Sequence, residues 1–410
     1  MPRLRTAALP LLAALAVALG LAAPATARGP VAHIAQEPTT PLVATPNDPG
    51  RTNVPGGWQE LQWNFLGAGF GIDAPGAWQN VAAAGHPGAD NVVVAVLDTG
   101  VAYANRGRYR ISPDLVGTRF TRGYDFVDDD RYPEDHNGHG THVASTIAER
   151  TNNAIALVGI AYNAVIMPVR VLDANGEGDA REIARGVRYA ADHGAAIINL
   201  SLEFGTEVRA KEIPRLLAAI RYAHRKGVFI VGASGNEAGT SIAYPARAAH
   251  VVSVGATTEH GCISDFSNEG PGLDIVAPGG GADADLPGDP NCRPLDPPGR
   301  DIYQMTFVGR SPRTFGLPSG YEGTSMAVPH VSGVAALIIA SGVLGANPTP
   351  DAIEARLKAT ARDLGAPGVD RHYGAGLINA NAATAPPAPP APPPAPSPPP
   401  AAADPATSSG

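Results

Sequence analysis

The sequence predicts an α/β fold in which a mostly parallel sheet is covered by helices on both faces. Short runs rich in Val, Ile and Leu are continuously apolar rather than alternating, which indicates strands buried on both faces. These runs alternate along the chain with stretches of helical pattern, the order typical of parallel sheets with crossover helices. The chain has 410 residues, enough for one large domain or two ordinary ones with a buried core.

The expected elements follow one another through the middle of the chain. Strands are predicted at 92–97, 165–172, 196–200, 228–232 and 251–256. Helices are predicted near 139–148, 181–193, 213–226 and 325–340. In open parallel sheets the functional residues gather at the carboxyl ends of the strands, so these ends are where a site is expected.

The amino terminus has the three parts of a secretory signal peptide. Two arginines precede an apolar run over residues 7–23, and the small residues 25–27 (ATA) supply a cleavage site. We therefore expect residues 1–27 to be removed and the mature protein to be secreted, or held in a bacterial periplasm or cell envelope. An uncleaved membrane anchor is the alternative, although the run is short for a bilayer and contains Pro10. No later segment is expected to span a membrane.

Neither end of the mature chain has the pattern of a folded domain. Residues 28–48 are polar, Pro-rich and without periodicity, which predicts a flexible leader or short prosegment. Residues 385–410 form a Pro/Ala-rich tract, predicted to be an extended, disordered tail. Between these ends the composition shifts nowhere sharply, so we expect one domain over residues 49–384.

The bulk composition argues against a nucleic-acid partner. Hydrophobic residues make up 44% of the chain, charged residues make up 17%, and the net charge is -8. Nucleic-acid binding usually needs a basic surface, which this charge balance does not predict.

The chain contains two cysteines, Cys262 and Cys292. In an exported protein such a pair predicts one disulfide rather than a metal site or a redox pair. Free buried thiols are the alternative.

Polar residues that suit nucleophilic catalysis follow one predicted strand and begin one predicted helix. Asp98 follows the strand at 92–97, and Gly100 permits a tight turn there. The segment 137–144 (NGHGTHVA) has two histidines three residues apart, on one side of a helix. This spacing suits either a metal pair or one catalytic histidine with a structural neighbour.

A serine and an asparagine could complete such a site. Ser325 begins a helix that is apolar around its whole circumference and hence buried, with free backbone N–H groups and the positive end of the helix dipole nearby. Pro329 is expected in the first turn, where loss of an N–H costs least. Asn236 follows the strand at 228–232 and could donate to an oxyanion or merely hold its own loop. Asp98, a histidine, Ser325 and Asn236 are the parts needed for acyl transfer.

Five segments of the chain resemble the hallmark segments of the subtilisin-like serine proteases, or subtilases. In order along the chain they are VAVLDTG, NGHGTHVA, INLSL, ASGN and YEGTSMAVPHVSG. The similarity runs from about residue 50 to about residue 382. The resemblance implies a three-layer subtilisin-like domain, with a sheet of about seven strands between helices, and makes 49–384 the catalytic domain.

The resemblance also implies roles for individual residues. Asp98, His139 and Ser325 would form the catalytic triad, with Asn236 in the oxyanion hole. His142 would occupy a structural position on the same helix as His139. Substrate binding would involve two segments: Ser201, Leu202 and Glu203 from one, and Ala233, Ser234 and Gly235 from the other.

The chain departs from the family pattern in places. Glu203 stands where the family has a glycine, which puts a charge at or near the substrate cleft. Val328 replaces a small residue or threonine, and the segment 279–319 is longer than in the compact members. Between residue 27 and the start of the similarity there is too little chain for the family's usual folding propeptide, which implies unaided folding or another route of activation.

A calcium site can be transferred from the family in the same way. The compact members hold the ion with a glutamine, an aspartate and a loop, and the matching side chains here are Gln62, Asp114 and Asn153. Main-chain carbonyls of Thr151, Ile155 and Leu157 would complete the site. Hard oxygen ligands of this kind suit Ca²⁺ rather than zinc. A plain surface turn is the alternative.

The function expected is that of a secreted, monomeric serine endopeptidase that acts on polypeptides. Ser325 would form the acyl-enzyme, His139 would act as general base, and Asp98 would orient the histidine. The alternatives are a pseudoenzyme that binds polypeptides, a serine esterase or transpeptidase, and a metalloprotein. The chain lacks the G-x-S-x-G and H-E-x-x-H motifs, which counts against an α/β-hydrolase and a zinc protease.

Overall fold

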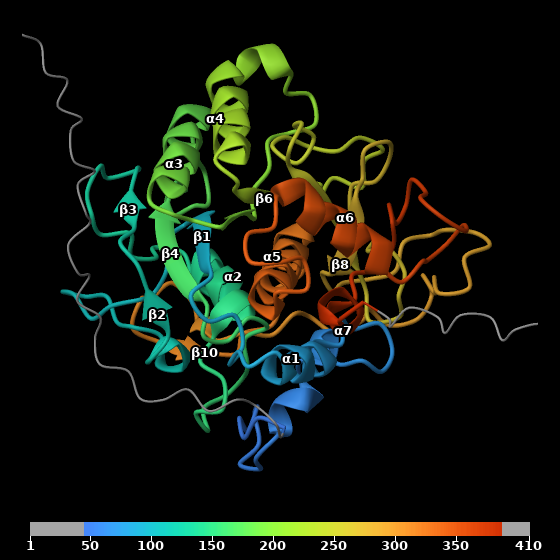
Figure 1. The fold of residues 1–410 in the computed structure, drawn as a ribbon, viewed down its shortest axis with the longest axis horizontal. Helices are drawn as coiled ribbons and strands as arrows, with labels where there is room; N and C mark the ends of the chain where they lie inside the picture. The colour runs from blue at the N-terminus through green and yellow to red at the C-terminus, as the bar shows by residue number, and fades with distance from the viewer. Residues whose placement is uncertain (1–44, 388–410) are drawn as a thin grey trace, which may run out of the picture. The chain divides into compact units, whose positions relative to one another are not determined.

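A computed structural model describes residues 45–387 of the chain, and their central feature is an eight-stranded sheet. Along the sheet the strands follow the order β2-β4-β1-β5-β6-β7-β8, while β3 pairs with the opposite end of β4 from β2. All of these pairs are parallel. The predicted fold class is confirmed (Figure 1).

The strands and helices have the following bounds. The strands are β1 Val93–Asp98, β2 Arg119–Phe120, β3 Tyr124–Asp125, β4 Val165–Arg170, β5 Ile197–Leu200, β6 Phe229–Ala233, β7 Val252–Thr257, β8 Ile275–Pro278, β9 Thr306–Phe307 and β10 Phe315–Gly316. The helices are α1 Ala74–Ala83, α2 His139–Ala148, α3 Ala180–Asp192, α4 Pro214–Arg225, α5 Thr324–Ser341, α6 Pro350–Thr360 and α7 Ala380–Thr384. Single 3₁₀ turns occur at Gly57–Glu60, Trp63–Phe65, Pro113–Leu115 and Ala210–Glu212. β9 and β10 form a separate antiparallel pair.

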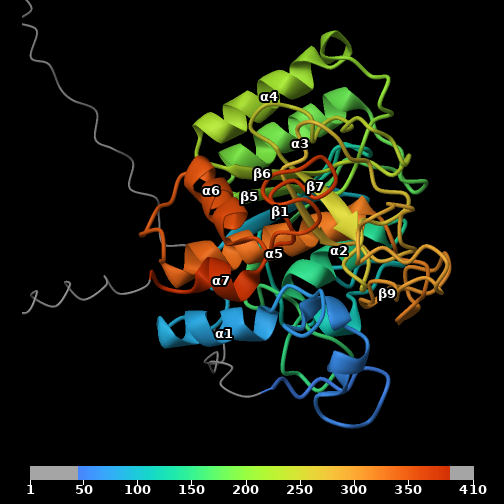
Figure 2. The same cartoon turned by 90° about the vertical axis from the view of Figure 1, so that its right-hand side faces the viewer.

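Each face of the sheet has its own core because successive strand residues point to opposite sides. In β1, Val94 and Val96 belong to the core shared with α1, α2 and α5. Ala95 and Leu97, the alternate residues, belong to the core shared with α3 and α4. Figure 2 shows the two helical layers on either side of the strands. The sheet is therefore buried on both faces, as the continuously apolar runs predict.

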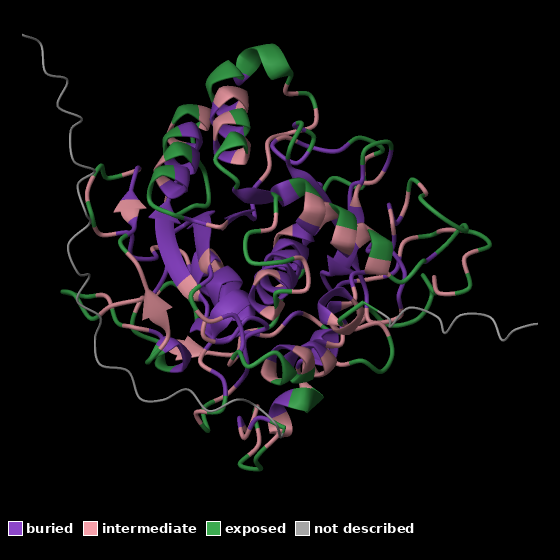
Figure 3. Cartoon of the chain, viewed as in Figure 1, coloured by how far each residue is buried: buried purple, intermediate pink, exposed green. Residues whose placement is uncertain are grey.

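Helix α5 passes through the middle of the larger core. It is long and apolar enough to cross a membrane, contrary to the expectation that no segment after the signal peptide would be. However, 83% of its residues are buried inside the protein, and Figure 3 shows the helix coloured mostly as buried and enclosed by other elements. Its apolar composition is accounted for by burial within the domain.

Each strand and helix predicted from the sequence is present in the structure, which also contains elements that the sequence pattern did not predict. The five predicted strands became β1, β4, β5, β6 and β7, and the predicted helices became α2, α3, α4 and α5. The elements not predicted from the sequence are β2, β3, β8, β9, β10, α1, α6 and α7. The predicted signal peptide (1–27), most of the leader (28–44) and most of the tail (388–410) lie outside the described residues.

Candidate active site

Asp98 ends β1 at the carboxyl edge of the sheet and is fully buried. Its Oδ1 accepts hydrogen bonds from the backbone N–H of Thr99 at 2.7 Å and from His139 Nδ1 at 2.8 Å. The α2 helix can come this close because its second residue is Gly140. A Cβ on Gly140 would lie 2.1 Å from the carbonyl oxygen of Gly100 and 3.0 Å from Cβ of Asp98. The glycine in HGTH is thus required for the Asp98–His139 contact.

A second buried aspartate, Asp135, fixes the start of α2. Its carboxylate accepts from the backbone N–H groups of Asn137, Gly138 and Thr141 at 2.9 Å each. It also accepts from the Thr99 hydroxyl at 2.9 Å, which ties the start of the helix to the end of β1. Asp135 is not among the residues predicted from the sequence. An aspartate just before a helix is a capping signal that could have identified it.

The structure separates the roles of the two histidines in the NGHGTH segment. The His139 side chain is 25% exposed and faces the cavity described below. His142 is fully buried, its Nε2–H donates to the carbonyl of Ile302 at 2.9 Å, and its ring stacks on Tyr321 with centroids 4.1 Å apart. Burial lowers the pKa of His142 to about 3. His142 is therefore a neutral packing residue, and only His139 can exchange protons with a substrate.

The electrostatics of His139 are dominated by burial and by Asp98. Burial lowers the pKa of the imidazole, whereas the charge of Asp98 and its hydrogen bond raise it, and the net effect is a pKa above the ordinary value. A carboxylate at Nδ1 also fixes which ring nitrogen carries the proton, leaving Nε2 as the acceptor. This is the arrangement expected of a general base.

Ser325 lies in the first turn of α5, after Gly323. Its hydroxyl donates to the carbonyl of Ser201 at 3.3 Å, and its own carbonyl accepts from the Ser201 hydroxyl at 2.8 Å. Pro329 lies inside α5 rather than in the first turn as expected. Because a proline has no N–H, the carbonyl four residues earlier, that of Ser325, loses its helical partner. Ser201 supplies the missing donor.

Asn236 is oriented by the same turn. Its Oδ1 accepts from the backbone N–H of Thr324 at 2.8 Å and from the Thr324 hydroxyl at 3.0 Å. The amide oxygen of Asn236 therefore binds the start of α5, and the NH₂ group points away from that helix. Its Nδ2 donates to Oε1 of Glu203 at 3.2 Å. Asn236 does not merely hold its own loop, because both of its polar atoms contact other segments.

One cavity of about 540 Å³ brings part of this site together, although neither Asp98 nor Asn236 is among the residues that line it. His139 and Ser325 both line it, together with Thr99, Ser201, Leu202 and Glu203. The three residues of the other predicted substrate segment are not part of its wall. Ala233 and Ser234 are fully buried, and the Ser234 hydroxyl donates to the carbonyl of Asn268 at 2.9 Å. With Gly235, at φ 117°, they lead into the turn that carries Asn236.

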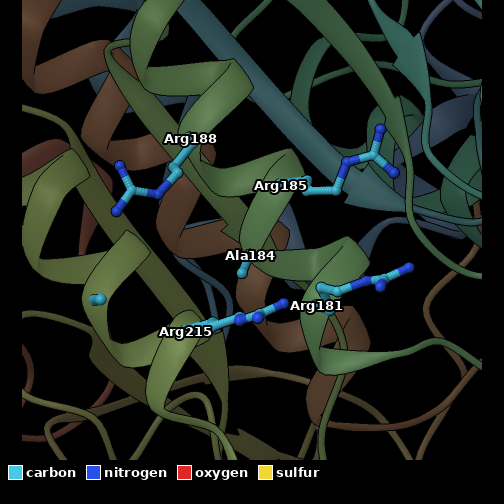
Figure 4. Close-up of a pocket in the computed structure, with 6 residues that line it drawn as sticks. Arg181, Ala184, Arg185, Arg188 and Arg215 are labelled. Atoms are coloured by element: carbon cyan, nitrogen blue, oxygen red, sulfur yellow. The ribbon is translucent and has the colours of Figure 1, made fainter.

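A second cavity, of about 490 Å³, lies between α3 and α4. It is lined by Ala184 and Ala218 and by four arginines, Arg181, Arg185, Arg188 and Arg215. Figure 4 shows the labelled arginines extending in different directions rather than converging on one point. None of the lining residues is a nucleophile or a base, so the candidate active site is the cavity that contains His139 and Ser325.

The expected calcium ligands are brought together only in part. Asp114 is fully buried and accepts from Asn153 Nδ2 at 2.8 Å and from the Leu157 N–H at 2.9 Å. Gln62 instead pairs with Val158, donating to its carbonyl at 2.8 Å and accepting from its N–H at 3.0 Å.

Asp48, the last residue of the predicted leader, contacts the same loop as Asp114. It is fully buried and accepts from the N–H groups of Asn152 at 2.7 Å and Asn153 at 3.1 Å. Within residues 45–387 no group of three or more His, Cys, Asp or Glu side chains is arranged to hold a metal ion.

The disulfide prediction is confirmed: Cys262 and Cys292 are bonded. The Cys292 sulfur also lies 3.6 Å from the hydroxyl of Tyr373, which donates to Asp289 at 2.7 Å. The disulfide thus holds the segment around Cys292 to Cys262, and Tyr373 connects the same segment to the carboxyl-terminal part of the domain.

The chain is similar to known proteases over most of its length. It is 38% identical to Subtilisin Savinase of Lederbergia lenta over 295 residues, which cover 72% of this chain and 90% of that protein. It is 34% identical to Thermitase of Thermoactinomyces vulgaris over 336 residues, 82% of this chain and 98% of Thermitase. The alkaline protease of Alkalihalobacillus alcalophilus is 38% identical, and the chain spans 64% of its length.

A structural neighbour and a family comparison agree with these relatives. A solved structure of a protease from Pseudoalteromonas arctica PAMC 21717 superposes with a TM-score of 0.66 at 31% identity, covering 83% of this chain and 99% of that one. The sequence model of the subtilase family matches residues 89–376, which include Asp98, His139, Asn236 and Ser325. The chain belongs to the subtilase family, whose members are serine endopeptidases.

Proposed function

We propose that Ser325, His139 and Asp98 hydrolyse peptide bonds through an acyl-enzyme. The observation that carries the proposal is the 2.8 Å contact between Asp98 and His139 Nδ1 beside a cavity that Ser325 also lines. Ser325 Oγ attacks the scissile carbonyl while His139 Nε2 takes its proton. His139 then gives that proton to the leaving amine. Water repeats the sequence to release the acyl group and restore the serine.

The tetrahedral intermediate needs donors for its oxyanion. Asn236 is supported for this task because Thr324 holds its amide oxygen, so its NH₂ group is the donor, and only one of the two amide hydrogens is used by Glu203. The backbone N–H of Ser325, in the first turn of α5, is the second donor we assign. Both donors are anchored before substrate arrives, so little reorganisation is needed during the reaction.

Labelling with a serine-directed phosphonate tests the assignment. The protein should be labelled once, on the peptide that contains Ser325, and labelling should stop peptide hydrolysis. Ser325→Ala should abolish both, whereas Ser341→Ala, at the far end of the same helix, should leave both intact. Hydrolysis that persists in Ser325→Ala would remove Ser325 as the nucleophile, and a protein that is neither labelled nor active would be a pseudoenzyme.

We assign the substrates as polypeptides and the location as outside the cytoplasm. The relatives are proteases, and the amino-terminal sequence has the pattern of a secretory signal peptide. Expression in a bacterial host, followed by amino-terminal sequencing of the exported form, tests both the export and the cleavage site after Ala27. Retention of an intact amino terminus in the membrane would contradict cleavage.

Calcium is a common structural ion in subtilases, and the region around Asp114 supports a site for it here. Burial raises the pKa of Asp114 to about 7 and also raises that of Asp48, so two poorly solvated carboxylates lie against one loop. Within residues 45–387, the carbonyl oxygens of Thr151, Ile155 and Leu157 accept no hydrogen bonds. A divalent cation would neutralise the carboxylates and use these carbonyls.

The hydrogen bonds of these side chains decide which of them we assign as calcium ligands. We assign Asp48, Asp114 and Asn153 as ligands together with the three carbonyls. Gln62 is not assigned, because its amide is paired with Val158. The ion would stabilise the folded loop and take no part in the chemistry at Ser325.

A further inference from the structure

Glu203 is the one acidic side chain of the active-site cavity that contacts the catalytic machinery directly. It follows β5, lines the cavity with His139 and Ser325, and reaches across to Asn236 Nδ2 at 3.2 Å. We infer that Glu203 makes this protease select substrates with a cationic side chain, lysine or arginine, on the residue whose carbonyl is attacked. The inference rests on the proposed function and adds the class of substrate.

The hydrogen bonds of Glu203 leave room for a cation. Oε1 accepts from Asn236, but Oε2 is buried and has no hydrogen-bond partner among the described residues. A buried carboxylate oxygen without a donor is costly, and an ammonium or guanidinium group can satisfy it with a charge-assisted hydrogen bond. The free enzyme thus holds an acceptor that a neutral apolar substrate side chain would leave unsatisfied.

The charges around the cavity favour the same substrates. Glu237 lies close enough to Glu203 to raise its pKa, and Glu177 also lines the cavity. No lysine or arginine is among the cavity-lining residues. His139 is the group there that could become cationic, and it must be neutral to act as a base. A cationic side chain therefore enters a negative environment with no competing positive charge.

The position of Glu203 identifies which substrate residue it meets. Asn236 is the proposed oxyanion donor, so its NH₂ group marks where the oxygen of the scissile carbonyl will lie. A carboxylate hydrogen-bonded to that same NH₂ group is adjacent to the residue that carries this carbonyl. The side chain of that residue is the part of the substrate nearest to Glu203.

The contact between Glu203 and Asn236 has a second consequence. While Asn236 donates to Glu203, one of its two amide hydrogens is not available to the oxyanion. A cationic substrate side chain that draws the carboxylate to itself releases this hydrogen. The preference should therefore appear in kcat as well as in KM, because the released donor acts in the transition state.

The pKa of Glu203 supports a pH dependence of the preference. Burial, followed by the charge of Glu237, raises the pKa to about 7. Above this value the carboxylate is charged and attracts a cation, whereas at lower pH it is neutral and the attraction is lost. The groups that face it are Asn236 and Glu237 after β6 and, around the cavity, His139 and Glu177.

A matched peptide series tests the inference in the full-length enzyme. The peptides differ only in the residue before the scissile bond, which is arginine, citrulline, lysine or norleucine. Citrulline has the shape of arginine without its charge. At pH 8.5 we expect kcat/KM to be about 10- to 100-fold higher for arginine than for citrulline, the range of one charge-assisted hydrogen bond. Equal values for the two peptides would overturn the inference.

Variants of Glu203 test whether this residue is responsible for the preference for a cationic side chain. Glu203→Gln should reduce the ratio of arginine to citrulline to about one while the norleucine peptide is still cleaved. Glu203→Asp, which keeps the charge, should retain part of the preference. Glu207→Gln, the same charge change at a nearby exposed position outside the cavity wall, should keep the parent ratio. If Glu203→Gln unfolds at the normal temperature and keeps the arginine-to-citrulline ratio of the parent enzyme, then another group is responsible for the preference.

The failure of this inference differs from the failure of the proposed function. An enzyme that is labelled at Ser325 and cleaves all four peptides equally has the proposed activity without the preference. An enzyme that is not labelled and cleaves none of them lacks the activity itself.

Discussion

Ser201 and Ser325 exchange hydrogen bonds in both directions: each hydroxyl donates to the main-chain carbonyl of the other residue, at 2.8 Å from Ser201 and at 3.3 Å from Ser325. The stronger of the two compensates for Pro329, which cannot donate to the Ser325 carbonyl as an ordinary helical residue would. The segment after β5, which lines the cavity, is thereby joined to the turn that carries Ser325, the proposed nucleophile.

This relationship predicts non-additive effects on stability. Ser201→Ala should lower the free energy of unfolding by about 1–3 kcal/mol, because it leaves the Ser325 carbonyl and the Asn199 amide unpaired. In a Pro329→Ala background the new N–H can serve the carbonyl, so the same change should cost less. Denaturant unfolding of the four proteins measures the difference. Strictly additive effects would show that Ser201 does not compensate for Pro329.

Asn236→Ala should reduce kcat and leave KM nearly unchanged, because an oxyanion donor acts in the transition state. Removal of one such donor in subtilisin, a relative of this protein, costs about 10²- to 10³-fold in kcat, and we expect a loss of that order. Steady-state kinetics on a norleucine peptide measures it. Thr324→Ser, which keeps both donors to the Asn236 oxygen, is the control and should stay near the parent rate. A parent-like rate in Asn236→Ala would remove Asn236 from the mechanism.

The pH dependence of kcat/KM should report His139. Its pKa is raised because the effect of Asp98 outweighs that of burial, and the base acts only when neutral. Activity should therefore be present above this pKa and lost as the pH falls through it, with the midpoint above the ordinary histidine value of about 6.5. Asp98→Asn should lower both the midpoint and the rate.

The titration of Glu203 must be kept apart from that of His139. A norleucine peptide and the Glu203→Gln background remove the charge effect of the carboxylate on the substrate. A profile that stays flat between about pH 5 and 8 under these conditions would contradict a histidine base.

Removal of calcium should lower the melting temperature and speed self-digestion, since a ligand that binds only the folded state stabilises it. Added calcium should restore both properties and zinc should not. Asp48→Asn and Asp114→Asn should weaken the response to calcium, while Gln62→Glu should not. Scanning calorimetry with and without chelator measures the response. Superimposable curves would show that the loop contacted by Asp48 and Asp114 binds no calcium.

Loss of the disulfide should destabilise the domain without changing its chemistry. The double variant Cys262→Ala/Cys292→Ala should lose about 3–4 kcal/mol of unfolding free energy, the chain-entropy estimate for a loop of this length. Its kcat on a peptide substrate should match the parent, because Asp98, His139 and Ser325 lie outside the loop. Limited proteolysis should cut the variant within the segment 279–319. Equal thermal resistance in both proteins would mean that packing alone orders this segment.

Local patterns in the sequence were sufficient for the fold class and for most of the elements around the site. Strands buried on both faces need an unbroken apolar run, so β1, β4, β5, β6 and β7 could be located from composition alone. β8, Ile275–Pro278, was missed although it is as long as β5, because no helical segment precedes it after β7. Asp98, His139, Asn236 and Ser325 were predicted as site residues because their segments match the subtilase pattern, and the disulfide was predicted from the cysteine pair and the expected export.

The partners of individual side chains were decided by the tertiary structure. Asp48 contacts a loop 104 residues away in the chain, Ser201 contacts Ser325 across 124 residues, and Asn236 contacts Glu203 across 33. Such contacts depend on how whole strands and helices are placed against one another, which a local periodicity does not encode. For this reason the sequence predicted a charge near the substrate cleft, and only the folded chain showed which donor that charge engages.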